Sequence, residues 1–320
     1  MGRYIIRRIL QAIPLLFLVS IFMFALIHLM PGGPDQVLFN PHLSPASRAA
    51  MRARFGLDDP VPLQYLKWLG NALTGNFGFS FGTNQLVSNV LGERFPATLE
   101  LFSSALVLAL VLAIFLGTVS AVRQGSATDY SITTLSYFGI AMPIFLFGLF
   151  AQYIFGVVLH WLPTSGMETL GYNLDPFNAF IDHVQHLILP MCVLAITFIA
   201  GWSRYMRSSM IEVVKQDYMR TARAKGVGPV KILIGHALRN AMIPLITVVA
   251  LNFGAIAGGA TITEGVFAWP GMGLLFFQSL QIRDYPVLLA MLMLGAVFVI
   301  AFNLIADILY AVMDPRIRYS

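Results

Sequence analysis

Few side chains in this sequence could do chemistry, and two histidines are the first candidates for a metal site. His183 and His186 stand three residues apart, so on a helix both imidazoles would lie on one face. A zinc site in a protein uses three or four side-chain ligands, and no third ligand is evident near this pair. We therefore predict no metal site and expect structural roles for the two histidines.

Nucleotide and hydrolytic chemistry are not predicted either. The chain contains no G-x-x-x-x-G-K-[ST] phosphate loop, and Lys225 precedes Gly226 without the required glycine spacing. No G-x-S-x-G or H-E-x-x-H motif occurs. We expect no catalytic residue and no cofactor on this chain, so that it is not an enzyme by itself. A serine–histidine pair brought together from distant positions stays open as an alternative.

Long apolar runs determine where these residues lie. The sequence is 58% hydrophobic and 11% charged, whereas a soluble domain has about 25% charged residues. A transmembrane helix needs about 20 mostly apolar residues, and six charge-free runs reach that length. We predict an all-α integral membrane protein with six transmembrane helices, near residues 9–30, 98–122, 135–160, 187–206, 241–263 and 286–311. The first helix is expected to be retained, because its apolar run is longer than that of a signal peptide.

The basic residues predict the orientation of these helices. Cytoplasmic loops of membrane proteins carry an excess of lysine and arginine. If the N-terminus is inside, the inner segments are 1–8, 123–129, 204–239 and 312–320, which hold 14 of the 20 lysines and arginines. Residues 161–186, on the outer side, hold none. Both termini are therefore expected in the cytoplasm.

The segment 31–97 is the only sizeable polar stretch between predicted spans. Helical pieces are predicted near Pro45–Phe55 and Pro62–Leu73, the second with Leu63, Leu66, Leu69 and Leu73 on one face with Trp68. The segment is too small to form a robust core of its own, so we expect a cap on the outer helix ends. The chain thus divides into 1–30, 31–97 and a five-helix core 98–320, whose cytoplasmic loop is 207–239.

Ionisable residues within the predicted spans are few. Glu100 and Glu264 stand at outer helix ends, where a water-facing cap is the simplest interpretation. Asp307 lies about one turn inside the last helix, four residues after Asn303, and we expect a structural polar pair there. An ion-coupled carrier usually shows ionisable residues inside the membrane. That class of transporter therefore remains only an alternative.

The segment YMRTARAKGVGPVKILIGHALRN, residues 218–240, has five basic and no acidic residues. We predict a surface helix over Glu212–Lys225, ended by Gly226 with Pro229 beyond, and a further helical piece from Ile232 to Leu238. A nucleic-acid site lacks any recognised motif. A lipid anchor explains the charges. Only a helix that docks into a cytoplasmic partner also explains the small residues Thr221, Ala222, Ala224 and Gly226.

These residues resemble the cytoplasmic EAA loop of bacterial ABC importer permeases, in the form of the B-type permease of dipeptide and oligopeptide importers. The resemblance extends over the whole chain. It is carried by RYIIRRIL, LMPGGP, FPATLEL, QDYMRTARAKG, TEGVFAWPGMG, RDYPV and DPRIR, in that order. Arg220-Thr221-Ala222 replaces the general Glu-Ala-Ala, and Leu238-Arg239 replaces Leu-Pro, as in the B-type subfamily.

The resemblance implies a type I ABC importer permease fold and a coupling helix over 218–227 that docks in a nucleotide-binding subunit. The implied contact residues are Tyr218, Arg220, Thr221, Ala222, Arg223, Ala224, Lys225, Gly226 and Val227. The implied partners are a second, C-type permease, two ABC ATPase subunits that bind ATP and Mg²⁺, an external substrate-binding protein, a peptide substrate and membrane lipid, with no nucleic acid. Glutathione, haem or a nickel complex are alternative substrates within the family. An ion-coupled secondary transporter, and a membrane scaffold or enzyme, are the alternatives from other classes.

The fifth predicted span has a small, partly polar face that could line a transport pathway. The candidates are Asn252, Gly258, Gly259, Thr261, Thr263 and Glu264. Close packing against another helix explains the small residues equally well, so both interpretations stay open. The following segment EGVFAWPGMG is expected to form an outer hairpin that dips toward the pathway, although Trp269 could instead be an interface aromatic.

Overall fold

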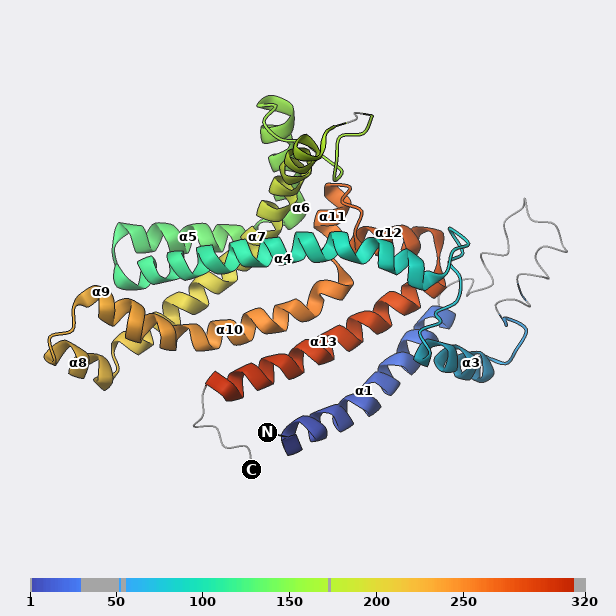
Figure 1. Ribbon diagram of the computed structural model, residues 1–320, viewed down its shortest axis with the longest axis horizontal. Coiled ribbons are helices and arrows are strands. Elements are labelled where there is room, and N and C mark those ends of the chain that lie inside the picture. The colour runs from blue at the N-terminus through green and yellow to red at the C-terminus, as the bar shows by residue number, and fades with distance from the viewer. Residues whose placement is uncertain (1, 30–51, 53–55, 172–173, 314–320) are drawn as a thin grey trace.

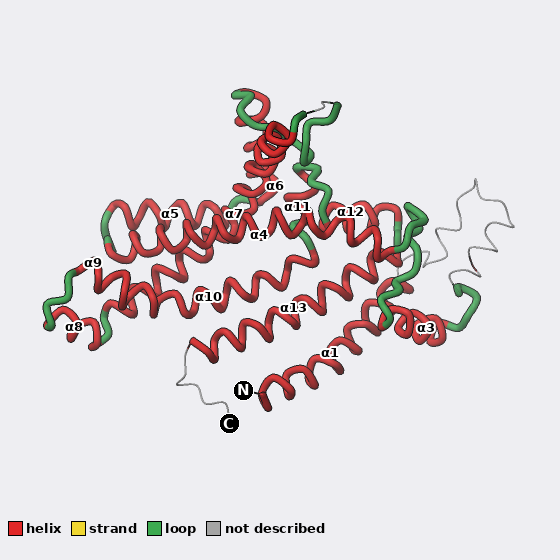
Figure 2. Tube along the Cα trace, in the orientation of Figure 1, coloured by secondary structure: helices red, strands yellow, loops and turns green. Residues whose placement is uncertain are grey.

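The computed structural model describes residues 2–29, 52, 56–171 and 174–313, and these form helices joined by turns and loops. Within this part of the chain, the only extended pairing is an isolated bridge between Phe79 and Leu86. Figure 2 shows the helices and the loops that join them. Five helical stretches are long and apolar enough to cross a membrane: 6–29, 87–122, 176–214, 229–256 and 285–309. The prediction of an all-α membrane protein is thereby confirmed.

The long helices pack along one another in a bundle (Figure 1). Its centre is formed by α4 (Val87–Val122), α7 (Pro176–Val214) and α10 (Arg239–Phe253), followed by α13 (Tyr285–Met313) and, at the edge, α1 (Gly2–Leu29). α4 presents Leu101, Ala105 and Ala109 as a buried stripe at helical spacing. α7 approaches α4 so closely that a Cβ at Gly117 would lie 2.7 Å from the Ser203 carbonyl oxygen. Small side chains therefore make the central contact possible.

The third predicted helix, 135–160, is not continuous. α5 (Ala127–Ala141) ends before Pro143, and α6 (Ile144–Ala151) continues as the π-helical η2 (Gln152–Val158). The two halves are bent by 101°. Proline has no N–H to donate and disfavours helical geometry in the residue before it, and Met142 is accordingly extended, with ψ 128°. Counted as one broken span, this pair brings the number of spans within the described residues to six.

The fifth predicted helix is also shorter at its outer end than expected. α10 stops at Phe253 and passes through the 3₁₀ turn η4 (Gly254–Gly258). Gly259 then has φ 71°, a conformation that glycine adopts readily and other residues do not. Two short helices follow, α11 (Thr261–Val266) and α12 (Met272–Ile282). The prediction of one helix over 241–263 is therefore wrong, and Thr261 lies on a different helix from Asn252.

The predicted helix near Pro62–Leu73 is confirmed as α3 (Val61–Leu73), but its buried face is not the leucine face. Leu66 is 61% exposed and Leu73 80% exposed. The contacts to α1 are instead aromatic, with the Tyr65 ring 5.4 Å from the Phe24 ring and the Trp68 ring 5.7 Å from it. The helical piece predicted near Pro45–Phe55 falls outside the described residues, apart from Arg52.

The predicted surface helix over Glu212–Lys225 is two helices in the structure. α7 continues to Val214, and α8 (Asp217–Ala224) begins after a two-residue turn. The helical piece predicted over Ile232–Leu238 is present as the π-helical η3, which follows the single turn α9 (Pro229–Lys231) and leads into α10. α8 lies at one end of the molecule and α3 at the other; the start of α1 and the end of α13 both point toward the α8 end (Figure 1).

Candidate functional site

α8 ends in a hydrogen-bond pattern that requires glycine at one position. The Gly226 N–H donates to the Arg223 carbonyl (3.0 Å), and the Val227 N–H donates to the Ala222 carbonyl (3.3 Å). This pair of bonds is the Schellman motif, in which the residue after the helix cap adopts a left-handed conformation. Gly226 has φ 74°. The glycine predicted from sequence as the turn residue therefore has a specific conformational reason to be there.

One side of α8 is held against the bundle. Met219 is 1% exposed and belongs to the central core cluster together with Met206, Met210 and Ile232. Ala222 and Val227 are half-buried and pack against the same cluster. The helix is thus attached to α7 and η3 by side-chain packing as well as by its connecting turns. Met219 was not among the residues singled out from sequence, although its apolar type among charged neighbours is the signal for an anchor.

The other side of α8 is a basic exposed surface. We call it the docking surface, and its members are Tyr218, Arg220, Thr221, Arg223, Ala224, Lys225 and Gly226, all of which are exposed. Arg220 has an acidic neighbour, Asp217, at 3.6 Å, and both side chains are exposed to water at 76% and 97%. Such a pair contributes little to stability. The docking surface therefore combines positive charge with small side chains over which a partner could approach closely.

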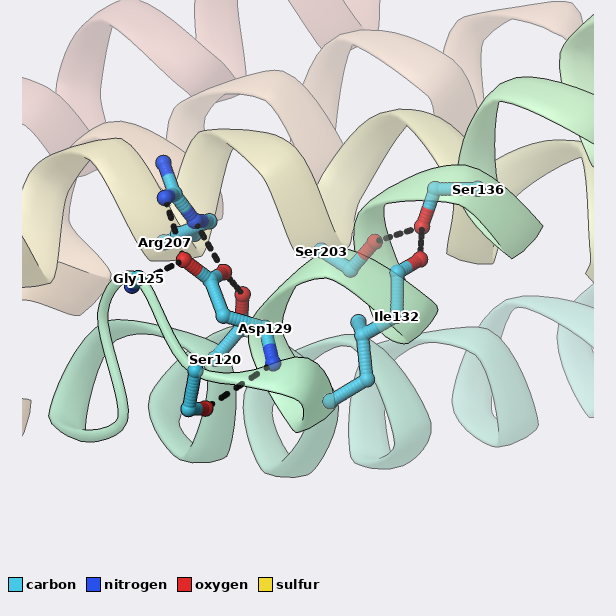
Figure 3. A network of polar contacts seen from close by, with 8 residues as sticks. Ser120, Gly125, Asp129, Ile132, Ser136, Ser203 and Arg207 are labelled. Carbon is cyan, nitrogen blue, oxygen red and sulfur yellow. Dashed lines mark hydrogen bonds and ion pairs between the residues drawn. The ribbon is translucent and has the colours of Figure 1, made fainter.

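An ion pair between a buried carboxylate and a partly exposed arginine connects α7, the helix that leads into α8, to α5 (Figure 3). Arg207 donates from Nε to Asp129 Oδ1 (2.7 Å) and from Nη2 to Oδ2 (2.8 Å). The same carboxylate accepts from Ser120 Oγ and from the Gly125 N–H, the latter at 2.9 Å. Asp129 is 2% exposed. One carboxylate thus joins the end of α4, the α4–α5 turn, the start of α5 and the part of α7 that leads toward α8.

Sequence reasoning did not find this pair, because its members are 78 positions apart. A local signal was nevertheless present. Ser126 is the N-cap of α5, and its Oγ accepts from the Asp129 N–H (3.3 Å). A serine followed three residues later by an acidic residue is typical of a helix N-terminus, but that pattern predicts only the helix start. The bond to Arg207 depends on the packing of α5 against α7.

Replacing Asp129 with asparagine is expected to lower the free energy of unfolding by about 2 kcal/mol, because Arg207 and the Gly125 N–H lose a charged acceptor. Thermal unfolding of the detergent-purified protein measures this. Asp58→Asn is the matched control, since Asp58 also pairs with an arginine, Arg52, but its side chain is 65% exposed. Equal unfolding temperatures for the two variants would contradict a structural role for the pair of Asp129 and Arg207.

A second buried network holds α11 and α12 at the other end of the bundle. Glu264 is fully buried. Its Oε1 accepts from Thr98 Oγ1 (2.9 Å) and from the Ala260 N–H (3.0 Å), and its Oε2 accepts from the Leu274 N–H (3.0 Å). The interpretation of Glu264 as a water-facing helix cap is therefore wrong. The carboxylate instead replaces water as the acceptor for backbone groups that the short helices leave unpaired.

Trp269 belongs to the same buried region. It is fully buried, and its indole Nε1 donates to the Ala97 carbonyl (2.8 Å). The alternative that Trp269 is an interface aromatic is wrong. Gly259 and Gly273 allow the turn before α11 to pack tightly against α12, since a Cβ at Gly259 would collide with the backbone nitrogen of Gly273.

The six candidate pathway residues are spread over three helical pieces and the turn between them. Asn252 and Thr261 are half-buried, and the Asn252 side chain donates to the Val248 carbonyl (2.7 Å). Gly258 is exposed and Gly259 forms the turn. Thr263 and Glu264 are buried within the chain. A single helix face containing all six does not exist, and their part in a pathway stays a prediction.

The remaining ionisable candidates form pairs. Asp307 forms an ion pair with Arg8 on α1 (Oδ2–Nη2 3.0 Å), so the structural pair expected at Asp307 exists, but with Arg8 instead of Asn303. Glu100 contacts His183 (Oε1–Nε2 2.6 Å), and His186 lies beside Asp182 (3.6 Å). Among the residues that the structure describes, no three or more His, Cys, Asp and Glu side chains are grouped as metal ligands would be.

Comparison with known proteins identifies a family that the sequence matches. Residues 109–319 match the family of binding-protein-dependent transport system inner membrane components, and residues 1–102 match the N-terminal part described for such components. The oligopeptide transport system permease protein AppB of Bacillus subtilis (strain 168) is 46% identical over 100% of both chains. The di/tripeptide transport system permease protein DppB of Pseudomonas aeruginosa (strain UCBPP-PA14) is 40% identical over 99% of both chains. The glutathione transport system permease protein GsiC of Escherichia coli (strain K12) is 37% identical over 100% of both.

Proposed function

Because the chain belongs to the family of binding-protein-dependent transport system inner membrane components, we propose that it forms one half of the translocation pathway of an ATP-driven peptide importer. It is a multi-pass membrane permease with an all-helical type I importer fold. Peptides are the proposed substrates, because full-length relatives carry oligopeptide and di/tripeptide names. The membrane is the bacterial cytoplasmic membrane, with α8 and both termini on the cytoplasmic side.

The observation that carries the proposal is the docking surface of α8. It is a short basic helix with small exposed residues, supported by Met219 from beneath and ended by Gly226. A helix presented in this way is suited to fit a groove of another protein. We propose that this groove belongs to an ABC ATPase subunit. Two such subunits bind ATP and Mg²⁺ in the complex. A second, C-type permease and an external substrate-binding protein complete it.

In the proposed mechanism, this chain transmits a movement. ATP binding closes the ATPase pair and displaces α8, which is joined to α7 by a two-residue turn and, through the Gly226 turn and α9, to η3 and α10. The bidentate bond between Arg207 and Asp129 makes α5 follow α7. The bundle changes from inward-facing to outward-facing, and peptide enters from the binding protein. Hydrolysis resets the bundle, so that each ATP state favours one of two conformations.

The test is to purify the tagged chain from native membranes in mild detergent, identify its partners by mass spectrometry and reconstitute the complex into liposomes. The expected result is a second permease with phosphate-loop ATPases, and peptide uptake that requires internal ATP. Uptake that survives ATP depletion but collapses with an uncoupler would overturn the proposal in favour of an ion-coupled carrier. Purification of the intact chain without any partner would contradict the docking role of α8.

Glutathione is a second candidate substrate, favoured by the full-length relatives that carry the name glutathione transport system permease. It is itself a small peptide, so the two candidates differ in size and linkage more than in chemistry. Competition between labelled dipeptide and unlabelled glutathione in the reconstituted complex separates them. At equal, saturating concentrations, loss of about half of the labelled uptake would identify glutathione as an equivalent substrate, and unchanged uptake would exclude it.

A further inference from the structure

Residues 164–169, which we call the outer segment, lie between η2 and α7, where α6 and the start of α7 project from the bundle (Figure 1). Two backbone N–H groups tie this segment to its neighbours. The Gly166 N–H donates to the Phe267 carbonyl (2.9 Å), and the Thr169 N–H donates to Asp182 Oδ2 (2.7 Å). The outer segment is thus held against the α11–α12 turn on one side and against α7 on the other.

His183 on α7 contacts the outer segment and α4 at the same time. Its Nδ1 lies 3.2 Å from the Met167 carbonyl oxygen, and its Nε2 lies 2.6 Å from Glu100 Oε1. Its ring also packs beside the indole of Trp269, with the ring centroids 5.9 Å apart. The side chains of His183 and Glu100 are 28% and 38% exposed, so the pair is not sealed inside the chain. The imidazole therefore links the outer segment to α4.

The positions of the two ring nitrogens require one proton more than a neutral histidine and an ionised glutamate carry. Both nitrogens of His183 face oxygen atoms, a carbonyl on one side and a carboxyl group on the other. A neutral imidazole has one N–H, and its other nitrogen is an acceptor. Both contacts are hydrogen bonds only if the pair holds an additional proton, on the imidazole or on the carboxyl group of Glu100. The protonated pair also has no net charge, which is favourable within a transmembrane helix.

Loss of that proton leaves one N–H for two acceptors. A hydrogen bond to a carboxylate is stronger than one to a neutral carbonyl, so the neutral imidazole keeps its bond to Glu100 through Nε2. Nδ1 then becomes an acceptor that faces the Met167 carbonyl oxygen, and two acceptors at 3.2 Å repel each other. The bond from α7 to the outer segment is therefore present while the pair is protonated and is lost as the pH rises.

Other titratable groups surround this pair. On α7, Asp182 accepts from the outer segment, and the His186 ring lies 3.6 Å from Asp182 Oδ1. Within the outer segment, Glu168 is exposed. The α11–α12 turn contributes the uncharged indole of Trp269. Asp182, His186 and Glu168 can each add a pH dependence of their own, and a variant of Glu100 separates their effects from that of the shared proton.

We propose that Glu100 and His183 form a proton-binding site whose bound proton attaches the outer segment to α7 and α4. In the orientation proposed above, the site lies on the external side of the membrane, so the external pH determines how firmly the segment is held. The inference rests on the proposed function only for that orientation. The attachment itself depends neither on transport nor on the substrate.

Glu100→Gln tests the proposal, because it removes the need for the proton and keeps both bonds. The glutamine amide donates to Nε2 of a neutral imidazole, and Nδ1–H then donates to the Met167 carbonyl. The purified complex is incubated in D₂O at about pH 5 and about pH 9, on either side of the range in which histidine usually changes charge. Mass spectrometry follows the exchange of the Gly166 and Thr169 N–H groups, relative to the same peptide of the unfolded chain at the same pH.

In the unaltered protein, the protection of these two N–H groups is expected to be about tenfold lower at the higher pH, because one hydrogen bond of a charged group is lost. Glu100→Gln should keep the protection of the acidic state at both pH values. His160→Asn is the matched control. It removes an exposed histidine that precedes the outer segment, and asparagine tolerates the φ of 53° found there. This variant should respond to pH as the unaltered protein does.

Equal protection of the unaltered protein at the two pH values would overturn the proposal. A loss of protection that persists in Glu100→Gln would also overturn it, since the proton would then belong to another group, such as His186 or Asp182. With the complex in lipid vesicles, the pH is raised on one side at a time. A loss of protection caused only from the side that carries α8 would overturn the control by external pH. None of these results requires uptake or ATP, so they are independent of a failure of the proposed transport.

Discussion

Replacing Gly226 with valine is expected to reduce ATP-driven uptake by roughly tenfold or more while the protein remains in the membrane. Gly226 has φ 74°. A left-handed conformation costs an L-residue with a Cβ roughly 1–2 kcal/mol, and β-branched side chains tolerate it least. The valine variant should therefore lose the bonds that end α8 and shift the docking surface relative to Met219. Uptake into liposomes that contain the reconstituted complex, with ATP hydrolysis followed in parallel, measures the effect.

Gly228→Val is the matched control for this prediction. Gly228 lies in the same exposed turn and, like Gly226, has no atom within 4 Å of an added Cβ. It differs in its backbone, with φ −62° and ψ 149°, which valine adopts without strain. Uptake should be close to normal in this variant. If both variants lost uptake equally, the bulk of the new side chain and not the left-handed turn would be the cause. Normal uptake in Gly226→Val would count against the docking role of α8.

Replacing Glu264 with alanine is expected to have the largest effect on folding. The Thr98 hydroxyl and the Ala260 and Leu274 N–H groups all donate to this carboxylate in a buried site. Each buried group left unpaired costs about 1–3 kcal/mol, and the net stability of a folded protein is only about 5–15 kcal/mol. The variant should therefore accumulate poorly in membranes and unfold at a clearly lower temperature.

Two further variants sharpen the Glu264 prediction. Glu264→Gln keeps one acceptor oxygen but places an NH₂ group against a donor, so its stability should lie between those of the alanine variant and the unaltered protein. Glu93→Ala removes an exposed carboxylate from the neighbouring helix α4 and should change stability little. Unfolding temperatures that are the same for Glu264→Ala and Glu93→Ala would show that the buried network does not hold α11 and α12.

The membrane spans could be predicted from sequence because they are long runs without charge, but their breaks could not. Pro14, Pro96, Pro190 and Pro244 all lie inside helices that continue past them. Pro143, in a run of the same composition, coincides with a bend of 101°. A proline removes one hydrogen bond in every case, and the neighbouring helices decide whether the chain bends. Composition alone does not contain that information.

In the candidate site too, features that depend on sequence neighbours could be predicted, and features that depend on distant residues could not. Gly226 could be predicted as a turn because the residues that require it are its immediate neighbours in sequence. The partners of Glu264 could not, since Thr98 is 166 positions away. The leucine spacing of α3 predicts an apolar face, but the periodicity of a helix does not say what covers that face, and these leucines are exposed in the structure.

The buried anchor and glycine cap of α8 have a consequence for the energetics of assembly. Because Met219 and the Gly226 turn order this helix within its own chain, binding of a partner need not spend free energy on folding it. A preorganised helix should associate with little loss of conformational entropy and without a slow folding step. It should also be stiff, so that a displacement imposed at its surface reaches α7 as motion instead of being absorbed by local unfolding. α8 is therefore ordered before a partner binds, and it can transmit a displacement to α7 without first having to fold.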